Sequence, residues 1–406
     1  MSPDSIPHCA EVKDIRDAEF RANPQYDLIS FEKIPDDQRE ILRDFHKDPE
    51  FFGILRPRRD SALAIKSICH ETASLFLQLK LPGKIPDHVK ADLGEHCSRS
   101  LATLVLDGVL EIRADGKFVS QSEAAAWIYE NPKEYVARGR IARLSLEALQ
   151  YAQQLAISDP QELSARLYFF NRLPVSANWI RQFPSTAAVR EHLGVEDGSI
   201  RRLDWGWSVV PSSPGTEGWI SWQAERMAHV PRPKATYKLY VSPHCSSVRK
   251  AFQETVGLLM ESQAHHFKVG RDVYGLLRPD KIVVYFRELD ELKRTAVKLE
   301  ARLAGCMAHG VPFSAELTND GLLSWGIDPP ADQRKIPNQE RESWRLWVTN
   351  RLATAILAAK NSRAEDSEPW RFALWRLSLE NIDTNTWTPG EGYWRDETAS
   401  SATGGA

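Results

Sequence analysis

Three short stretches between residues 236 and 286 decide the fold: Tyr-Lys-Leu-Tyr-Val at 237–241, His-Phe-Lys-Val at 266–269 and Lys-Ile-Val-Val-Tyr-Phe at 281–286. Apolar and polar side chains alternate along each stretch. Such alternation is typical of β-strands, because successive side chains point to opposite faces of a sheet. It predicts one apolar face that belongs to a core and a second face that carries cationic and phenolic groups.

The polar face collects groups that can bind an anion. If the three strands are neighbours, four side chains share this face: Lys238, Tyr240, Lys268 and Tyr285. Arg278 lies just before the third strand, where a loop meets the sheet. The pattern is compatible with a phosphate site, and also with the ordinary solvated face of a half-exposed antiparallel sheet, which the pattern alone favours.

The segments between these strands predict amphipathic helices. Apolar side chains recur every three to four residues in 246–262 and in 288–305, the spacing that places them on one helical stripe. A further strand is expected in 321–326. The order is the split β-α-β-β-α-β pattern of an α+β domain, with both helices on one face of the sheet.

Length and composition bound the class of protein. With 406 residues, of which 42% are hydrophobic and 26% charged, the chain is long enough for two or three domains. A net charge of −3 provides no general basic field for nucleic acid. The five cysteines have no zinc or CxxC spacing, which is typical of reduced thiols in the cytoplasm. Because the sequence has neither a signal-peptide-like start nor a long apolar run, we expect a cytoplasmic protein without a membrane span; secretion without a signal peptide stays open.

The N-terminal part is expected to be mostly helical. We predict an irregular arm over 1–35 and a helical region over 36–230, including a helix at 61–79. Near 85–120, two helix-like segments precede Asp115-Gly116, a strong hairpin signal between short alternating runs. This layout fits a winged helix or an ordinary small helical subdomain. Its second helix carries Arg99 as the single cation, which disfavours DNA. The Trp-rich stretch 203–222 is interpreted as a linker held to a core.

The C-terminal domain is predicted over 231–395. It begins after the Pro231-Arg232-Pro233 boundary and includes helices at 342–360 and 370–379. Residues 396–406 have the composition of a disordered tail.

Motifs for cofactors and metals are absent from the sequence. There is no P-loop, no GxGxxG after a strand, no HExxH and no GxSxG. His265 and His266 are adjacent, so on a strand they point to opposite faces and do not chelate one ion together. We therefore expect neither a cofactor nor a bound metal.

Three further segments follow residues 236–286, and their order is informative. The first is Gly-Val-Pro-Phe at 310–313 with Gly-Ile-Asp-Pro-Pro at 326–330. The second is Glu-Ser-Trp at 342–344, and the third is Asn-Ile-Asp at 381–383 with Trp-Thr-Pro-Gly at 387–390. Together they resemble the HopA-type effector domain, over about residues 230–390. That domain occurs in plant-pathogen type III effectors and in the lyases of some lanthipeptide and thioamitide pathways.

The resemblance implies an activity and roles for residues. The lyase members are similar to phosphothreonine lyases, which β-eliminate phosphate from phosphoserine or phosphothreonine and leave a dehydroamino acid. It implies that Lys268 is the base for the α-proton, that Tyr240 stands where that family has its acid His, and that phosphate is bound by Lys238, Arg278 and Tyr285. A base of this kind must be neutral, and burial and neighbouring cations lower a lysine pKa.

The chain departs from the family after Ser343. Trp344-Arg345 stands where the family reads Phe-Gly, and Val348 lies near the position of a family Arg. Arg345 and Arg351 are candidates for an additional phosphate contact. The alternative to a lyase is therefore a non-catalytic HopA-like effector or scaffold that binds a peptide, a kinase or a host partner.

The lyase hypothesis implies partners. Its substrate would be a phosphorylated precursor peptide, and a separate kinase would be needed because the chain has no kinase motif. The module near 85–120 would hold the leader peptide or the kinase. A winged-helix regulator is a third hypothesis. We expect neither a nucleic-acid nor a membrane partner, and the sequence does not indicate an oligomeric state.

Overall fold

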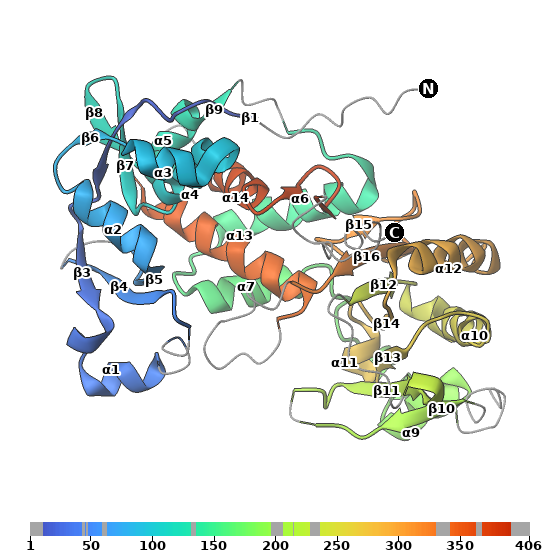
Figure 1. Ribbon diagram of the computed structural model, residues 1–406. Coiled ribbons are helices and arrows are strands. Elements are labelled where there is room, and N and C mark those ends of the chain that lie inside the picture. Colours follow the sequence, from blue (N-terminus) through green and yellow to red (C-terminus); the bar gives the residue numbers. More distant parts are fainter. Residues whose placement is uncertain are drawn as a thin grey trace, which may run out of the picture.

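The computed structural model describes residues 11–42, 45, 48–58, 63–130, 135–195, 206–213, 215–227, 236–329, 342–362 and 368–390. It is a mixed α/β structure with several antiparallel sheets, the largest in the order β10-β11-β13-β14-β12-β16-β15 (Figure 1). These strands are β10 (Trp207–Val210), β11 (Trp219–Ala224), β12 (Tyr237–Val241), β13 (His266–Gly270), β14 (Ile282–Phe286), β15 (Ala315–Glu316) and β16 (Leu323–Ile327).

The register of the central strands places the polar residues on one face. β14 lies between β13 and β12, and both pairs are antiparallel. Tyr240 and Lys268 both lie opposite Val283, from its two sides. Lys238 lies opposite Tyr285. Because directly opposed residues share a face of the sheet, the alternation in the sequence puts all four polar side chains on the same side.

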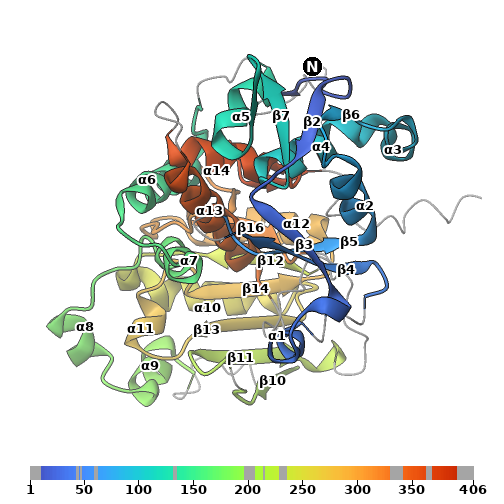
Figure 2. The ribbon, with the colours of Figure 1, turned by 90° about the vertical axis from the view of Figure 1, so that its left-hand side faces the viewer.

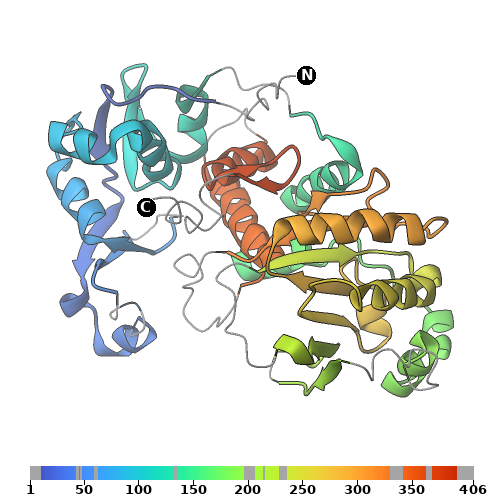
Figure 3. The same cartoon turned by 45° about the vertical axis from the view of Figure 1, so that its right-hand side comes forward.

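The other face is buried under two helices, α10 (Val248–Leu259) and α12 (Leu289–Arg302), which lie side by side over the sheet (Figure 3). The strand side chains on this face include Leu239, Phe267 and Val284, all fully buried. Each contributes about 1.5–3 kcal/mol by its burial. A slip of one residue in register would expose this whole set, so the apolar face fixes which way the lysines point.

The Trp-rich stretch differs from the prediction of a linker. Part of it forms β10 and β11, which extend the sheet beyond β13. Trp222 is 2% exposed and stacks on Phe267 with ring centroids 4.7 Å apart. Trp219 lies on the opposite, polar face, three residues earlier in the strand. The stretch is therefore part of the domain core, because its indoles have the neighbouring strand to pack against.

Two helices approach the polar side of the sheet, α7 (Pro160–Tyr168) and α13 (Trp344–Asn361) (Figure 1). They pack together and share a hydrogen bond of 3.0 Å between Ser164 and Thr349. Trp344 lies against Gly326, where a Cβ atom would come within 2.4 Å of the indole. Gly326 is opposite Lys238 in the register. The start of α13 therefore rests directly beside the lysines.

The remaining helices surround this core or connect to it. α6 (Gly139–Gln154) and α14 (Pro369–Ser378) pack beside α13, and β17 (Ile382–Asp383) pairs with β18 (Thr388–Pro389). Three further short helices are α8 (Ala177–Gln182), α9 (Thr186–Leu193), which packs against α10, and α11 (Val273–Leu276), which packs against β13.

The N-terminal residues build two further small sheets, ordered β6-β2-β7-β8 and β3-β4-β5 (Figure 2). Their strands are β2 (Glu19–Ala22), β3 (Tyr26–Ser30), β4 (Phe51–Pro57), β5 (Lys66–Cys69), β6 (Gly83–Lys84), β7 (Leu110–Ala114) and β8 (Lys117–Val119), and β1 (Glu11–Val12) pairs with β9 (Tyr129–Glu130). The helices are α1 (Asp36–Ile41), α2 (His70–Gln78), α3 (Asp87–Leu93), α4 (Cys97–Leu106) and α5 (Gln121–Ile128).

This region contains more strand than predicted. Residues 1–35 were expected to be an irregular arm, but β1, β2 and β3 lie within it, with Phe20 fully buried and Tyr26 3% exposed. Within 36–230, expected to be helical, β4 and β5 form a sheet, and the helix predicted from residue 61 begins only at His70. Ile65, within the range predicted as that helix, is 62% exposed. These strands were missed because β2 alternates over only 4 residues and β4 shows no alternation of apolar and polar side chains.

Near 85–120 the structure has two helices followed by a hairpin. α3 and α4 precede β7 and β8, which turn at Asp115-Gly116. Both turn residues have positive φ, 46° and 78°, the requirement of the tight turn that Asp-Gly favours. Arg99 on α4 donates to the carbonyls of Ser378 and Leu379. That cation is therefore used within the protein.

Two predictions lie outside the described residues: the boundary at 231–233 and the tail at 396–406. No helix in the described ranges combines the length and the apolar character needed to cross a membrane.

Candidate functional site

Lys268 of β13 lies on the polar face of the sheet, beside the ring of Trp219. Its Nζ lies 4.0 Å from the centroid of the Trp219 ring and makes no hydrogen bond or ion pair with any residue in the described ranges. Burial, and next the positive charge of Lys238, lower the pKa of Lys268 from 10.5 to about 7. Near neutral pH a large share of these amines therefore carries a free lone pair.

Lys238 of β12 is buried and forms an ion pair with Asp328, which follows β16. Its Nζ lies 5.4 Å from the centroid of the Tyr285 ring, and the Nζ of Lys268 lies 5.8 Å from the same centroid. The one phenol ring therefore contacts both lysines. The ion pair with Asp328 fixes Lys238 in place, whereas no carboxylate of the described residues pairs with Lys268.

The two tyrosines differ in their surroundings. Tyr240 is 3% exposed and packs with Val283 and Val311. Burial raises the pKa of both Tyr240 and Tyr285 well above 10. Both are therefore neutral phenols that can donate a proton or a hydrogen bond, and neither hydroxyl has a hydrogen-bond partner among the described residues.

His266 lies on the same face, opposite Tyr285, with ring centroids 4.7 Å apart. Burial, and next the charge of Lys268, lower its pKa from 6.5 to about 3. A histidine beside two lysines is thus held neutral and adds no further charge to the site.

Arg278 reaches the site from the loop before β14, and Trp219 connects it with Lys268. The guanidinium lies 4.8 Å from the centroid of the indole that also contacts Lys268. Its Nε and Nη2 donate to the two oxygens of Asp280 at 2.8 and 2.9 Å. Nη2 also donates to the hydroxyl of Tyr168 at 3.1 Å. The sequence predicted Arg278 but not the three residues around it.

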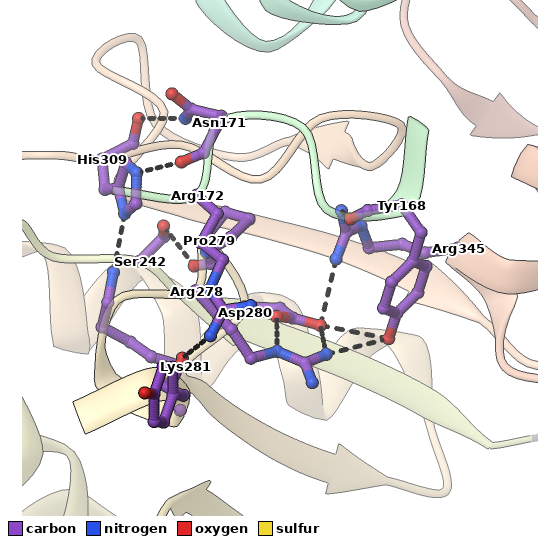
Figure 4. A network of polar contacts seen from close by, with 12 residues as sticks. Tyr168, Asn171, Arg172, Ser242, Arg278, Pro279, Asp280, Lys281, His309 and Arg345 are labelled. Atoms are coloured by element: carbon purple, nitrogen blue, oxygen red, sulfur yellow. Dashed lines mark hydrogen bonds and ion pairs between the residues drawn. The ribbon is translucent and has the colours of Figure 1, made fainter. Parts of the chain in front are cut away.

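Asp280 is shared with a second arginine, Arg345 of α13 (Figure 4). Nη1 of Arg345 lies 3.0 Å from Asp280, in an ion pair without hydrogen-bond geometry. Burial acts to raise the pKa of Asp280, but the charges of Arg278 and Arg345 outweigh it and hold that pKa well below its usual range. The carboxylate therefore stays ionised inside the protein.

Arg345 and Arg351 were candidates for an additional phosphate contact. Arg345 is 1% exposed, and its Nε and Nη2 donate to the carbonyls of Pro312 and Tyr168. Arg351 lies against the Trp347 ring at 3.6 Å and 4.0 Å from Glu342. Val348, which the sequence resemblance places near an arginine position, is fully buried.

A second buried lysine lies next to this group. Lys281 donates to the carbonyl of Pro243 at 2.7 Å. It also contacts Nδ1 of His309 at 2.8 Å (Figure 4). His309 contacts the carbonyl of Asn171 through Nε2 at 2.5 Å, so Nε2 carries the proton and Nδ1 accepts from the lysine. Burial lowers the pKa of Lys281 to about 7. All its contacts are internal, and the network ties the loop before β14 to the end of α7.

Some site residues escaped the sequence analysis. Trp219 carried a usable signal, because 219–224 alternates as a strand would. Asp280 follows Arg-Pro closely in the sequence, but its pairing depends on the turn. Tyr168 gave no signal, because it comes from a helix outside the stretch that resembles a family.

The assembled groups suit a dianion and a proton transfer. Fixed cations flank a lysine that can be neutral, and phenols surround them, an arrangement that stabilises a leaving phosphate and accepts a proton. In the described part of the chain, no three His, Cys, Asp or Glu side chains gather as a metal site would require.

Comparisons with known proteins give remote structural similarity. No protein-family model matches the chain, and no curated protein matches it. Among solved structures, an effector protein from Pseudomonas syringae pv. tomato strain DC3000 is 13% identical, covers 62% of this chain and 99% of its own, and has a TM-score of 0.40.

Two phosphothreonine lyase effectors are also similar. VirA (SpvC) of Chromobacterium violaceum is 18% identical and covers 35% of this chain and 77% of its own, with a TM-score of 0.25. OspF of Shigella flexneri is 16% identical and covers 36% and 77%, also with a TM-score of 0.25. At such scores the chain's function has to be inferred from its own residues.

Proposed function

We propose that this protein is a lyase that removes phosphate by β-elimination from phosphoserine or phosphothreonine in a precursor peptide and leaves a dehydroamino acid. The observation that carries the proposal is Lys268, a half-buried amine with a pKa lowered to about 7, without a hydrogen-bond partner in the described residues, on the face that also holds Lys238. A base for a weakly acidic α-proton needs this combination.

The chain's own residues take the following parts. The lone pair of Lys268 takes the proton from Cα of the phosphoresidue. The electrons of that C–H bond form the Cα=Cβ double bond, and the Cβ–O bond breaks so that its electron pair leaves with the phosphate. Lys238 and Arg278 stabilise the departing charge, with a hydrogen bond from Tyr285. Tyr240 donates a proton or a hydrogen bond to the leaving oxygen.

The partners belong to the same proposal. A separate kinase supplies the phosphorylated peptide, and the two helices and hairpin near 85–120, as a winged-helix-like module, hold the leader segment of that peptide or the kinase. The sheet that carries the site is the split β-α-β-β-α-β sheet of a HopA-like lyase domain. The reaction uses no cofactor and takes place in the cytoplasm.

The test is mass spectrometry of phosphoserine and phosphothreonine peptides incubated with the purified protein in ¹⁸O-labelled water. A lyase yields unlabelled phosphate and a dehydroamino acid that a thiol then captures, because no water is consumed. A phosphatase yields labelled phosphate and the free hydroxyl. Lys268→Ala is expected to abolish turnover, and the exposed-residue variant Lys293→Ala is the matched control. Intact peptides with the wild-type protein and the partner kinase present would refute the lyase.

A non-catalytic binding protein is the second candidate, and two observations favour it. Val348 puts a buried aliphatic side chain where the family has an arginine. Asp328 already occupies Lys238. Such a protein would bind the phosphopeptide in calorimetry without changing it, and its binding would still depend on Arg278.

A further inference from the structure

The guanidinium of Arg278 is held on two sides and open on the third. Asp280 accepts from Nε and Nη2, and Tyr168 accepts from Nη2. Nη1 has no partner among the described residues, and it is not among the fully buried polar atoms. In Figure 4 this nitrogen points away from Asp280. The side chain is 17% exposed, so one edge of an otherwise fixed arginine stays available to a ligand.

The group that holds Arg278 is itself anchored in the core. Asp280 has a 5% exposed side chain, and Arg345 behind it is fixed by two backbone carbonyls. One of these carbonyls belongs to Tyr168, whose ring lies 4.6 Å from the Arg345 guanidinium. Arg345 therefore balances the charge of Asp280 and also holds the residue that carries the third contact to Arg278.

We propose that Asp280, Tyr168 and Arg345 are positioning residues that hold Arg278 with Nη1 turned toward the substrate phosphate. This inference rests on the proposed function for the identity of the ligand. It assigns Arg345, a candidate for direct phosphate contact, to a supporting role. It also makes α7 a part of the phosphate site, although this helix lies outside residues 230–390.

The physical reason for such a support is entropy. A free arginine loses rotamer freedom when it binds an anion, and a guanidinium already fixed by a carboxylate does not have to lose it again. Asp280 lies close to where a dianion would bind, and its negative charge would repel phosphate if it were alone. Arg345 removes that disadvantage because it pairs with the same carboxylate.

A double-mutant cycle tests the proposal through binding. All variants carry Lys268→Ala to stop turnover, and calorimetry measures the affinity for a phosphoserine peptide. Tyr168→Phe and Asp280→Asn are each expected to weaken binding by about three- to ten-fold, the range that one hydrogen bond to a charged group supports. In the Arg278→Met background the same two changes are expected to have no effect. Equal effects in both backgrounds would overturn the proposal. Tyr151→Phe, an exposed tyrosine on α6, is the control.

Chemical rescue provides a readout that a merely structural role would not change. In Arg278→Ala, added guanidinium ion is expected to restore peptide binding, because Asp280 and Tyr168 still form a cradle of the right shape. In Arg278→Ala/Asp280→Asn the ion is expected to have no effect. Rescue in both variants would overturn the role of Asp280. Since both experiments read binding, they remain decisive for the positioning residues even if the wild-type protein eliminates no phosphate.

Discussion

Replacing Lys238 by Met is expected to move the pH dependence of elimination to higher pH. Burial is the main cause of the lowered pKa of Lys268, and the positive charge of Lys238 is the next. The substitution removes the second cause and leaves burial in place. It also frees Asp328 from its ion pair, and an unpaired carboxylate nearby raises the pKa of Lys268 further. Both consequences of Lys238→Met act in the same direction.

The size of the effect follows from the neutral fraction of Lys268. With its pKa lowered from 10.5 to about 7, about half of the amines are neutral at pH 7, whereas an ordinary lysine has about one in 3,000. If the charge of Lys238 accounts for ~1 pKa unit, or ~1.4 kcal/mol of repulsion, the variant has a pKa near 8. Its neutral fraction at pH 7 is then about five-fold lower.

The assay is kcat/KM for a phosphoserine peptide between about pH 5.5 and 9.5, followed by mass spectrometry. In the wild type, kcat/KM rises ten-fold per pH unit below the pKa of the free base and levels off above it. Lys238→Met also loses a phosphate contact, which lowers the plateau. The substrate phosphate titrates at about pH 6 with both proteins, so the shift of the rising limb between variant and wild type reports the pKa of Lys268. The matched variant Lys293→Met on the exposed side of α12 leaves the limb in place. A limb that stays at pH 7 or moves lower in Lys238→Met would refute the reasoning.

Other changes test stability and packing. Lys268→Met is expected to raise the free energy of unfolding at pH 7 by about 1–3 kcal/mol in urea titrations. The pKa of Lys268 is lower in the folded protein than in the unfolded chain, so burying its ammonium costs most below about pH 7. The stability gained by the substitution therefore fades as the pH rises from about 7 toward 10.5. A variant that is less stable than wild type at pH 7 would contradict this. Val348→Arg is expected to cost more than about 3 kcal/mol, because it places a charge at a fully buried position. A variant with an unchanged thermal midpoint would show that the position is not closed. Trp222→Ala is expected to cost about 3–5 kcal/mol through loss of its stack on Phe267, against about 0.5 kcal/mol or less for Val209→Ala at an exposed position in β10; similar losses would exclude a core role for β11.

The sequence could predict the polar face because strand alternation is a local property. Once the register follows from the buried apolar side chains, the positions of Lys238 and Lys268 follow as well. The same reasoning failed for β2, which alternates over only 4 residues, and for β4, whose Phe-Phe-Gly-Ile-Leu-Arg-Pro sequence does not alternate. Local pattern identifies a strand, whereas pairing decides whether it belongs to a sheet.

The surroundings of Arg278 lay beyond such reasoning. Tyr168 is 110 positions away in the sequence, and only the packing of α7 against α13 brings its hydroxyl to the guanidinium. Arg345 is a charged residue on a helix whose neighbours Trp344 and Trp347 are fully buried. That environment is a usable signal, since a buried arginine needs a carboxylate partner. It does not reveal which carboxylate the partner is.

The charges of the assembled site favour transfer of a proton to Lys268. Three fixed cations, Lys238, Arg278 and Arg345, face two carboxylates, Asp280 and Asp328, which leaves a net charge of +1 while Lys268 is neutral. A bound phosphate dianion changes this to −1, and protonation of Lys268 by the α-proton restores neutrality. Because a net charge is costly in a low-dielectric site, the negative charge left after phosphate binds makes Lys268 a stronger base. The pKa of Lys268 is therefore expected to be higher in the substrate complex than in the free protein. The rising limb of the pH profile of kcat should then lie at higher pH than that of kcat/KM. Coincident limbs would mean that the phosphate binds too far from Lys268 to affect it.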